Sequence, residues 1–276
     1  MYTRVLIPVL LMWGAMARAS YFEDVHVHSD AMNKDVPVFM IFPDTYKQGV
    51  EVRYPVVYVL HGAGGNRKSY ATQGSPLLKL ADQYGVIVVC PDGAKTSWWL
   101  DSPIDPTMKY ETFVVKELVP HVDKNLRTLA QREKRGITGC SMGGHGACYL
   151  ALRNKQLFGV VGNVYGGVDL RPFPKNWEIS KRLGTLQEYP ENWERHSVIT
   201  LAQELQNKEL SLLTMIGNKD FFLGVNRALH QLLADKGVEH YYIEAQGAHT
   251  HEFADEALPV MFRFINTYFT EGRGHL

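Results

Sequence analysis

The sequence predicts an α/β domain with a mostly parallel central sheet, helices on both faces and an antiparallel hairpin near its N-terminal end. Two patterns lead to this prediction. Short, nearly unbroken apolar runs rich in β-branched residues recur along the chain, as in strands that are covered on both faces. Segments with apolar residues every three or four positions stand between them, and strands that alternate with helices form βαβ units with right-handed crossovers.

The elements follow in order along the chain. The segments 25–27 and 36–42 are expected to form two strands around a polar turn at 29–34. Further strands are expected at 54–60, 86–90, 158–164, 210–216 and 238–243. Helices are expected at 110–126, 143–153, 226–236 and 253–269, with a bend at Pro120 because proline has no N–H to donate. In such sheets, function gathers in the loops at the carboxyl ends of the strands.

Composition excludes several classes of protein. The chain has 276 residues, of which 45% are hydrophobic and 21% charged, which excludes a disordered chain, a fibrous repeat and a multi-span membrane protein. Basic and acidic side chains each number 29, so no overall field favours binding to nucleic acid. Without a linker or an internal repeat, residues 20–276 are expected to form a single domain.

Residues 1–19 have the pattern of a secretory signal peptide. Arg4 supplies the positive charge, 5–17 form the apolar region, and the small residues Ala17 and Ala19 stand before Ser20 as a signal peptidase requires. The alternatives are a retained anchor and a buried N-terminal helix. Cleavage would leave a periplasmic or secreted protein without a membrane segment.

The three cysteines are not expected to form a disulfide framework. Cys90, Cys140 and Cys148 are odd in number and lie in or beside apolar stretches, so buried, inert thiols are expected even after export.

The strongest chemical motif is G-x-S-x-G at 139–143, which points to Ser141 as a nucleophile. Such a serine sits on a tight strand-to-helix turn, so the residues two before and two after it must be small. The alternative is a glycine-rich packing turn. His145, in the helix that follows, is expected to pack behind the turn.

A serine hydroxyl needs a base, and the base needs an orienting acid. On such turns the chain order is Ser, acid, His, each at the end of a strand. Asp220 follows the strand 210–216 and His249 follows the strand 238–243, so both stand where this order requires. His251 and Asp169 are the alternative base and acid. The pair His249 and His251, with Glu252 beside it, also resembles part of a metal site. A third well-placed ligand is not evident, so no metal is expected.

Two backbone amides are expected to hold the negative oxygen that forms when serine attacks a carbonyl group. One belongs to Met142, directly after the nucleophile. The other is assigned to Ala63, in the glycine loop 61–66 that follows the strand 54–60. The loop alone is also compatible with a phosphate cradle, but no Lys-Ser or Lys-Thr pair of the Walker type follows it.

These motifs together resemble the esterase family that includes esterase D, tributyrin esterases and family 1 carbohydrate esterases. The resemblance extends from about residue 21 to 269 and rests on HGAGGN at 61–66, TSWWLDSP at 96–103, GCSMGGHGA at 139–147, GNKD at 217–220 and GAH at 247–249. It implies an α/β-hydrolase fold, a serine carboxylesterase mechanism with no metal or organic cofactor, and Ser141, Asp220 and His249 as the triad. This chain differs at Cys140, where leucine is common, and at His251 and Ala254, where many members have tryptophan or another aromatic residue.

Four residues are expected to contact substrate: Trp98, Trp99, His61 and His251. The two tryptophans are the best aromatic candidates for the cleft, where they would stack on a sugar or line an acyl pocket, and the alternative is ordinary core packing. The long segment 165–200 interrupts the βαβ rhythm and is expected to cover the site in part.

The sequence therefore predicts an exported serine carboxylesterase acting on a small-molecule or oligosaccharide ester. The acyl group is expected to be acetyl, feruloyl or a short chain of the tributyrin type. An acyltransferase would use the same triad, and a non-catalytic carbohydrate-binding homologue is the alternative from a different class.

Overall fold

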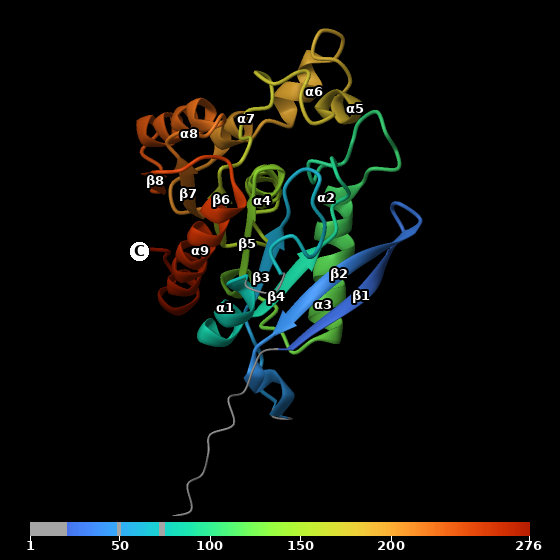
Figure 1. Ribbon diagram of the computed structural model, residues 1–276, viewed down its shortest axis with the longest axis vertical. Coiled ribbons are helices and arrows are strands. Elements are labelled where there is room, and N and C mark those ends of the chain that lie inside the picture. Colours follow the sequence, from blue (N-terminus) through green and yellow to red (C-terminus); the bar gives the residue numbers. More distant parts are fainter. Residues whose placement is uncertain (1–20, 49–50, 72–74) are drawn as a thin grey trace, which may run out of the picture.

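A computed structural model describes residues 21–48, 51–71 and 75–276 (Figure 1). The predicted signal peptide, 1–19, lies outside the described residues. Eight strands form one sheet in the order β1-β2-β4-β3-β5-β6-β7-β8. Their bounds are β1 Tyr21–Ser29, β2 Lys34–Phe42, β3 Val56–Leu60, β4 Ile87–Pro91, β5 Arg135–Cys140, β6 Val160–Val164, β7 Ser211–Gly217 and β8 Tyr241–Ala245.

The sheet confirms the predicted arrangement of strands. β1 and β2 form the expected antiparallel hairpin, and β2 pairs antiparallel with β4. All other neighbouring strands are parallel. The carboxyl ends of β3 to β8 therefore lie along one end of the sheet, where a site in this kind of fold is expected.

The helical segments cover the sheet and the carboxyl ends of its strands. Their bounds are η1 Asp44–Gln48, α1 Leu77–Tyr84, α2 Tyr110–Thr112, η2 Phe113–Leu118, α3 Val119–Asn125, η3 Arg132–Lys134, α4 Met142–Arg153, α5 Ile179–Leu183, α6 Pro190–Arg195, α7 Val198–Leu201, η4 Ala202–Glu204, α8 Leu223–Asp235 and α9 His251–Glu271. α2, η2 and α3 follow one another without a break. The turn before Pro120 is a π-helix, in which the Val119 amide bonds to the Val114 carbonyl, so the regular helical hydrogen-bond pattern is interrupted just before the proline.

Helices lie on both faces of the sheet, as predicted. A Cβ on Gly136 would meet the side chains of Ile265 and Phe269 in α9, whereas one on Gly139 would meet the backbone of Gly143 in α4. Because side chains alternate along a strand, positions 136 and 139 of β5 face opposite sides. α9 therefore covers one face and α4 the other, and α1 packs with α9.

Several elements differ from the sequence prediction. No range was assigned to β5, although the strand-to-helix turn predicted at Ser141 implies a strand there. Its sequence RGITGC holds two glycines and little apolar surface, yet all its residues are buried. α1, the short helices α5 to α7 and the 3-10 segments η1, η3 and η4 were not expected. β8 begins three residues later than predicted, because residues 237–238 form the end of α8. Gly237 has φ 67°, and the Val238 amide donates to the Leu233 carbonyl, as at a helix C-terminus.

The segment 165–200 contains α5, α6 and most of α7, and Figure 1 shows α5 and α6 together at one end of the molecule.

All three cysteines are buried and free, as expected. No helix in the described ranges is long and apolar enough to cross a bilayer.

Candidate active site

Ser141 stands on the sharp turn between β5 and α4. Its backbone has φ 60° and ψ −118°, a conformation that residues with side chains rarely adopt. A Cβ on Gly139 would lie 2.5 Å from the Gly143 carbonyl oxygen, and one on Gly143 would lie 2.0 Å from the Leu60 carbonyl oxygen. Glycine is therefore required two residues before and two residues after the serine, which is the physical basis of the predicted motif.

The loops that follow β7 and β8 lie directly against each other. The Asn218 amide donates to the Ala245 carbonyl at 2.8 Å, and the Lys219 amide donates to the Gly247 carbonyl at 2.9 Å. A Cβ on Gly217 would lie 2.5 Å from that same Gly247 oxygen, so only glycine permits this approach. The next residues of the two loops are therefore brought together.

Ser141, His249 and Asp220 form one chain of hydrogen bonds. His249 Nε2 lies 2.8 Å from Ser141 Oγ, and His249 Nδ1 lies 2.8 Å from Asp220 Oδ2. When Nδ1 donates to the carboxylate, Nε2 is free to accept the serine proton. The other oxygen of Asp220 accepts from the Phe222 amide at 2.8 Å, and the carboxylate is fully buried while 18% of the imidazole is exposed. This arrangement can activate a hydroxyl nucleophile.

The alternative acid and base make other interactions in the structure. Asp169 pairs with Arg171 at 2.8 Å and accepts a hydrogen bond from Ser197, so it does not contact His249. His251 begins α9 and does not bond to Ser141. Within residues 21–48, 51–71 and 75–276, no three His, Cys, Asp or Glu side chains are grouped as a metal site would need.

Residues 62–65 of the glycine loop line an open cleft of about 420 Å³ together with Ser141 and His249. A Cβ on Gly62 would lie 3.2 Å from the Ser141 Cβ, so the loop approaches the nucleophile closely. The amides of Ala63 and Met142 have no acceptor in the described part of the chain. An amide that is to bind a substrate oxygen must be free in this way. The further residues that line the cleft are Asn66, Ser69, Tyr70, Tyr165, Thr250 and His251.

Three of the four expected substrate contacts are corrected by the structure. Trp98 and Trp99 are 1% and 0% exposed, and His61 is 2% exposed, so none of them faces the cleft. The Trp99 ring fills the space above Gly146 of α4, where a Cβ would lie 2.5 Å from it. His61 accepts from the Gly93 amide at 2.8 Å, and burial lowers the pKa of this imidazole. These buried side chains pack against the elements that carry the site and do not contact substrate. His251 does line the cleft, with its ring 5.8 Å from that of Tyr70.

An aromatic clamp around His249, formed by Tyr165 and Phe221, was not expected from the sequence. The centroids of the Tyr165 and Phe221 rings lie 4.3 and 4.2 Å from that of the imidazole. The two rings make no contact with each other in the described residues, so they approach the imidazole from different sides. The Tyr165 hydroxyl also donates to the Thr250 carbonyl at 3.1 Å, which anchors the loop just after the histidine. Tyr165 directly follows strand β6, and Phe221 directly follows Asp220. These positions in the sequence were the only available indication that the two rings lie near the site.

The segment 165–200 supplies Tyr165 to this clamp and also contacts it through Trp177. Its ring stacks on Phe221 at 5.3 Å and 26°. The Trp98 indole N–H donates to the Trp177 carbonyl at 3.3 Å, and Trp177 has φ 45°. The segment is also tied down by the ion pair between Arg182 and Asp105 at 2.7 Å. Trp98 thus helps to place an aromatic wall beside the imidazole, although it does not reach the cleft itself.

His145 lies behind the nucleophile turn, where the sequence placed it. It is 0% exposed, bonds through Nδ1 to the Gly167 carbonyl at 3.0 Å, and packs edge-on against Trp98. Burial lowers the pKa of this imidazole to about 3, so it is neutral at physiological pH.

Comparisons with known proteins identify a family for this chain. The model of a family described as "Putative esterase" matches residues 29–265. An acetyl esterase of Caldicellulosiruptor saccharolyticus is 23% identical over 88% of this chain and 97% of its own length. An endo-1,4-beta-xylanase/feruloyl esterase of Xylanibacter ruminicola is 33% identical over 44% of this chain and 18% of its own length. A solved ferulic acid esterase superposes with a TM-score of 0.77 at 24% identity, covering 90% of this chain and 99% of that one.

Some of these relatives are much longer than the matched region. The esterase Rv1288 of Mycobacterium tuberculosis is 31% identical over 49% of this chain, but the match spans only 30% of that protein. The structural likeness establishes the expected α/β-hydrolase fold, with its central, mostly parallel sheet.

Proposed function

This chain belongs to the esterase family whose model covers residues 29–265, and we propose that it is a serine carboxylesterase. The observation that carries the proposal is the pair of 2.8 Å contacts that His249 makes with Ser141 and Asp220. A buried acid, a partly exposed imidazole and a serine on a strained turn are the parts that nucleophilic attack on an ester requires.

The reaction proceeds in two steps. Ser141 Oγ attacks the ester carbonyl carbon while His249 Nε2 takes the hydroxyl proton, and the amides of Ala63 and Met142 hold the resulting oxyanion. The carbon–oxygen bond to the alcohol then breaks, and His249 returns the proton to the leaving alkoxide. Water, activated by the same imidazole, attacks the acyl-enzyme and releases the acid. Asp220 keeps the imidazole in the productive tautomer throughout.

The proposed substrates are short-chain or carbohydrate-linked acyl esters, with acetyl, feruloyl and tributyrin-type groups as the classes to compare. Two features support this range. The cleft of about 420 Å³ is open enough for a bulky alcohol, and the relatives include an acetyl esterase and a xylanase/feruloyl esterase. Initial rates on acetylated xylan, methyl ferulate and tributyrin rank the three classes.

The decisive experiment compares Ser141→Ala with Ser180→Ala, a serine in α5 outside the cleft. We expect Ser141→Ala to lose hydrolysis of p-nitrophenyl acetate and labelling by a fluorophosphonate probe, whereas Ser180→Ala keeps both. Retained turnover in Ser141→Ala would refute the assignment. A wild-type protein that the probe does not label would instead be a non-catalytic homologue, and an acylated sugar as the main product would assign acyl transfer.

We also propose that residues 1–19 direct export and are removed, leaving a periplasmic or secreted enzyme. The support is the order of Arg4, the apolar run 5–17 and the small residues at 17 and 19. Expression of the full chain in a bacterial host should give an exported protein that begins at Ser20. An Ala19→Asp change should prevent processing. Wild-type protein that retains Met1 in the cytosol would contradict export.

A further inference from the structure

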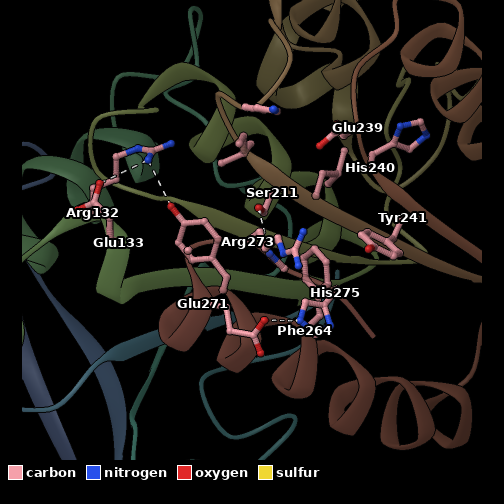
Figure 2. A pocket seen from close by; sticks show the side chains of 16 residues that line it. Arg132, Glu133, Ser211, Glu239, His240, Tyr241, Phe264, Glu271, Arg273 and His275 are labelled. Atoms are coloured by element: carbon pink, nitrogen blue, oxygen red, sulfur yellow. Dashed lines mark hydrogen bonds and ion pairs between the residues drawn. The ribbon is translucent and has the colours of Figure 1, made fainter.

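A second hollow of about 980 Å³ lies at the other end of the strands from the triad, between the amino ends of β7 and β8 and the end of α9 (Figure 2). The side chains that line it include Ser211, Tyr241, Phe264 and Arg273. Asp220 and His249 follow the carboxyl ends of the same strands. The two sites are thus separated by about one strand length, roughly 17 Å for five residues. A ligand in the hollow would leave the catalytic cleft free.

The hollow presents one exposed and firmly held aromatic ring. Tyr241 is 39% exposed, and its ring packs edge-on against the buried Phe264 at 5.5 Å and 66°. Figure 2 shows Tyr241 at one side of the hollow, with Phe264 next to it. An aromatic face fixed in this way can receive the apolar C–H face of a sugar ring without losing side-chain entropy on binding.

Donors and acceptors without partners line the same hollow. The side chains of Arg273, Lys208 and Glu239 line the hollow and make no hydrogen bond or ion pair within the described ranges. Two of them carry N–H donors and the third carries carboxylate acceptors, which together match the mixed hydroxyl groups of a sugar.

The lining is linked by hydrogen bonds and balanced in charge. The Gly274 amide donates to Ser211 at 3.4 Å, and His275 pairs with Glu271 at 2.7 Å, so the residues after α9 are held in place. Three basic side chains face three acidic ones in the wall, namely Arg132, Lys208 and Arg273 against Glu133, Glu239 and Glu271. This balance disfavours an anion or a cation and favours a large, neutral, polar ligand.

We propose that this hollow binds a neutral stretch of polysaccharide and so holds the enzyme on the polymer that carries its ester. The proposal rests on the carbohydrate-ester function above, because only a polymeric substrate makes a distant second site useful. Binding at two sites on one chain raises the effective concentration of the ester near Ser141.

The test uses full-length Ser141→Ala protein and two ligands, soluble xylan in native affinity gels and uncharged xylohexaose in titration calorimetry. We expect xylan to retard the protein, and Tyr241→Ala to weaken xylohexaose binding about tenfold. Tyr241→Phe should retain binding. The control is Tyr189→Ala, since Tyr189 is 41% exposed but lies between α5 and α6. Arg273→Ala, at an exposed side chain without a partner, gives a second measure should Tyr241→Ala not fold.

In the active enzyme, Tyr241→Ala should slow hydrolysis of acetylated xylan and leave p-nitrophenyl acetate hydrolysis unchanged. Failure to bind xylohexaose, binding only to the acidic polymer polygalacturonate, or equal binding by Tyr241→Ala and Tyr189→Ala would overturn the proposal. Failure of the esterase assignment is separate: the wild-type protein would then bind xylan through Tyr241 but hydrolyse no ester.

Discussion

At the scale of single residues, the environment of His249 depends on side chains that no motif identifies. Tyr165 holds the loop after the histidine through its hydroxyl, and Phe221 stacks on the imidazole at 28°. Phe221 is 50% exposed, so burial alone does not explain its position. We infer that it restricts the imidazole to the orientation in which Nε2 faces Ser141, and that Trp177 supports it from the other direction.

The change Phe221→Ala should release the imidazole from this orientation. Loss of an aromatic contact of about 0.5–1.5 kcal/mol should lower kcat for p-nitrophenyl acetate several-fold, up to about tenfold, with KM little changed. Phe221→Tyr should restore kcat. Phe22→Ala is the control, because Phe22 is 57% exposed and also stacks on a ring, that of Phe39, but lies on β1. A rise in KM alone would show that Phe221 binds substrate and does not position the base.

At the scale of elements, glycines decide how closely β5 and α4 approach the neighbouring backbone. Gly143 and Gly224 make a matched pair in two helices: a Cβ on Gly143 would lie 2.0 Å from the Leu60 carbonyl oxygen, while one on Gly224 meets nothing within 4 Å. The same substitution should therefore have opposite effects at the two positions.

Gly143→Ala should cost at least about 1–3 kcal/mol of unfolding free energy and reduce activity, because backbone atoms must shift to admit the methyl group. Gly224→Ala should gain about 0.5–1 kcal/mol, since alanine loses less entropy in a helix. Urea unfolding at neutral pH measures both. Equal stabilities of the two variants would show that the turn can relax without cost.

At the scale of the whole molecule, the buried His145 links stability to pH. Burial lowers its pKa to about 3 in the folded protein, below the ordinary imidazole value of 6.5. The unfolded chain therefore binds the extra proton first, and the contribution of neutral His145 to stability is complete above pH 6.5 and declines as the pH falls toward 3. Between pH 7 and pH 5 the loss from this one group is about 2 kcal/mol.

His145→Asn isolates this term, because the asparagine amide retains a donor toward the Gly167 carbonyl but does not titrate. Chemical unfolding at pH 7 and pH 5 should show that the wild-type protein loses about 2 kcal/mol more than the variant. His61, whose pKa is also lowered by burial, contributes in the same direction in both proteins and cancels in the difference. Equal losses would mean that His145 already titrates normally in the fold.

The sequence alone determined seven of the eight strands, four helical segments, the hairpin at the N-terminal end, and the serine, acid and histidine that meet in the structure. Each of these follows from local rules: periodicity for the elements, glycine spacing for Ser141, and position after a strand for Asp220 and His249. β5 could not be recognised by its apolar content, because its glycines make room for α9 and α4, which are distant in sequence.

Only the tertiary structure decided which aromatic side chains reach the site. Trp98 and Trp99 stand in a loop at the carboxyl end of the sheet, as a substrate contact would, yet they are buried beneath it. Phe221 and Tyr165 surround the imidazole instead. The direction of a loop side chain depends on individual backbone angles, here φ of 54° and 59° at the two tryptophans, and on the packing of remote helices. Neither the backbone angles nor this packing produces a periodic pattern or a motif that can be read from the sequence.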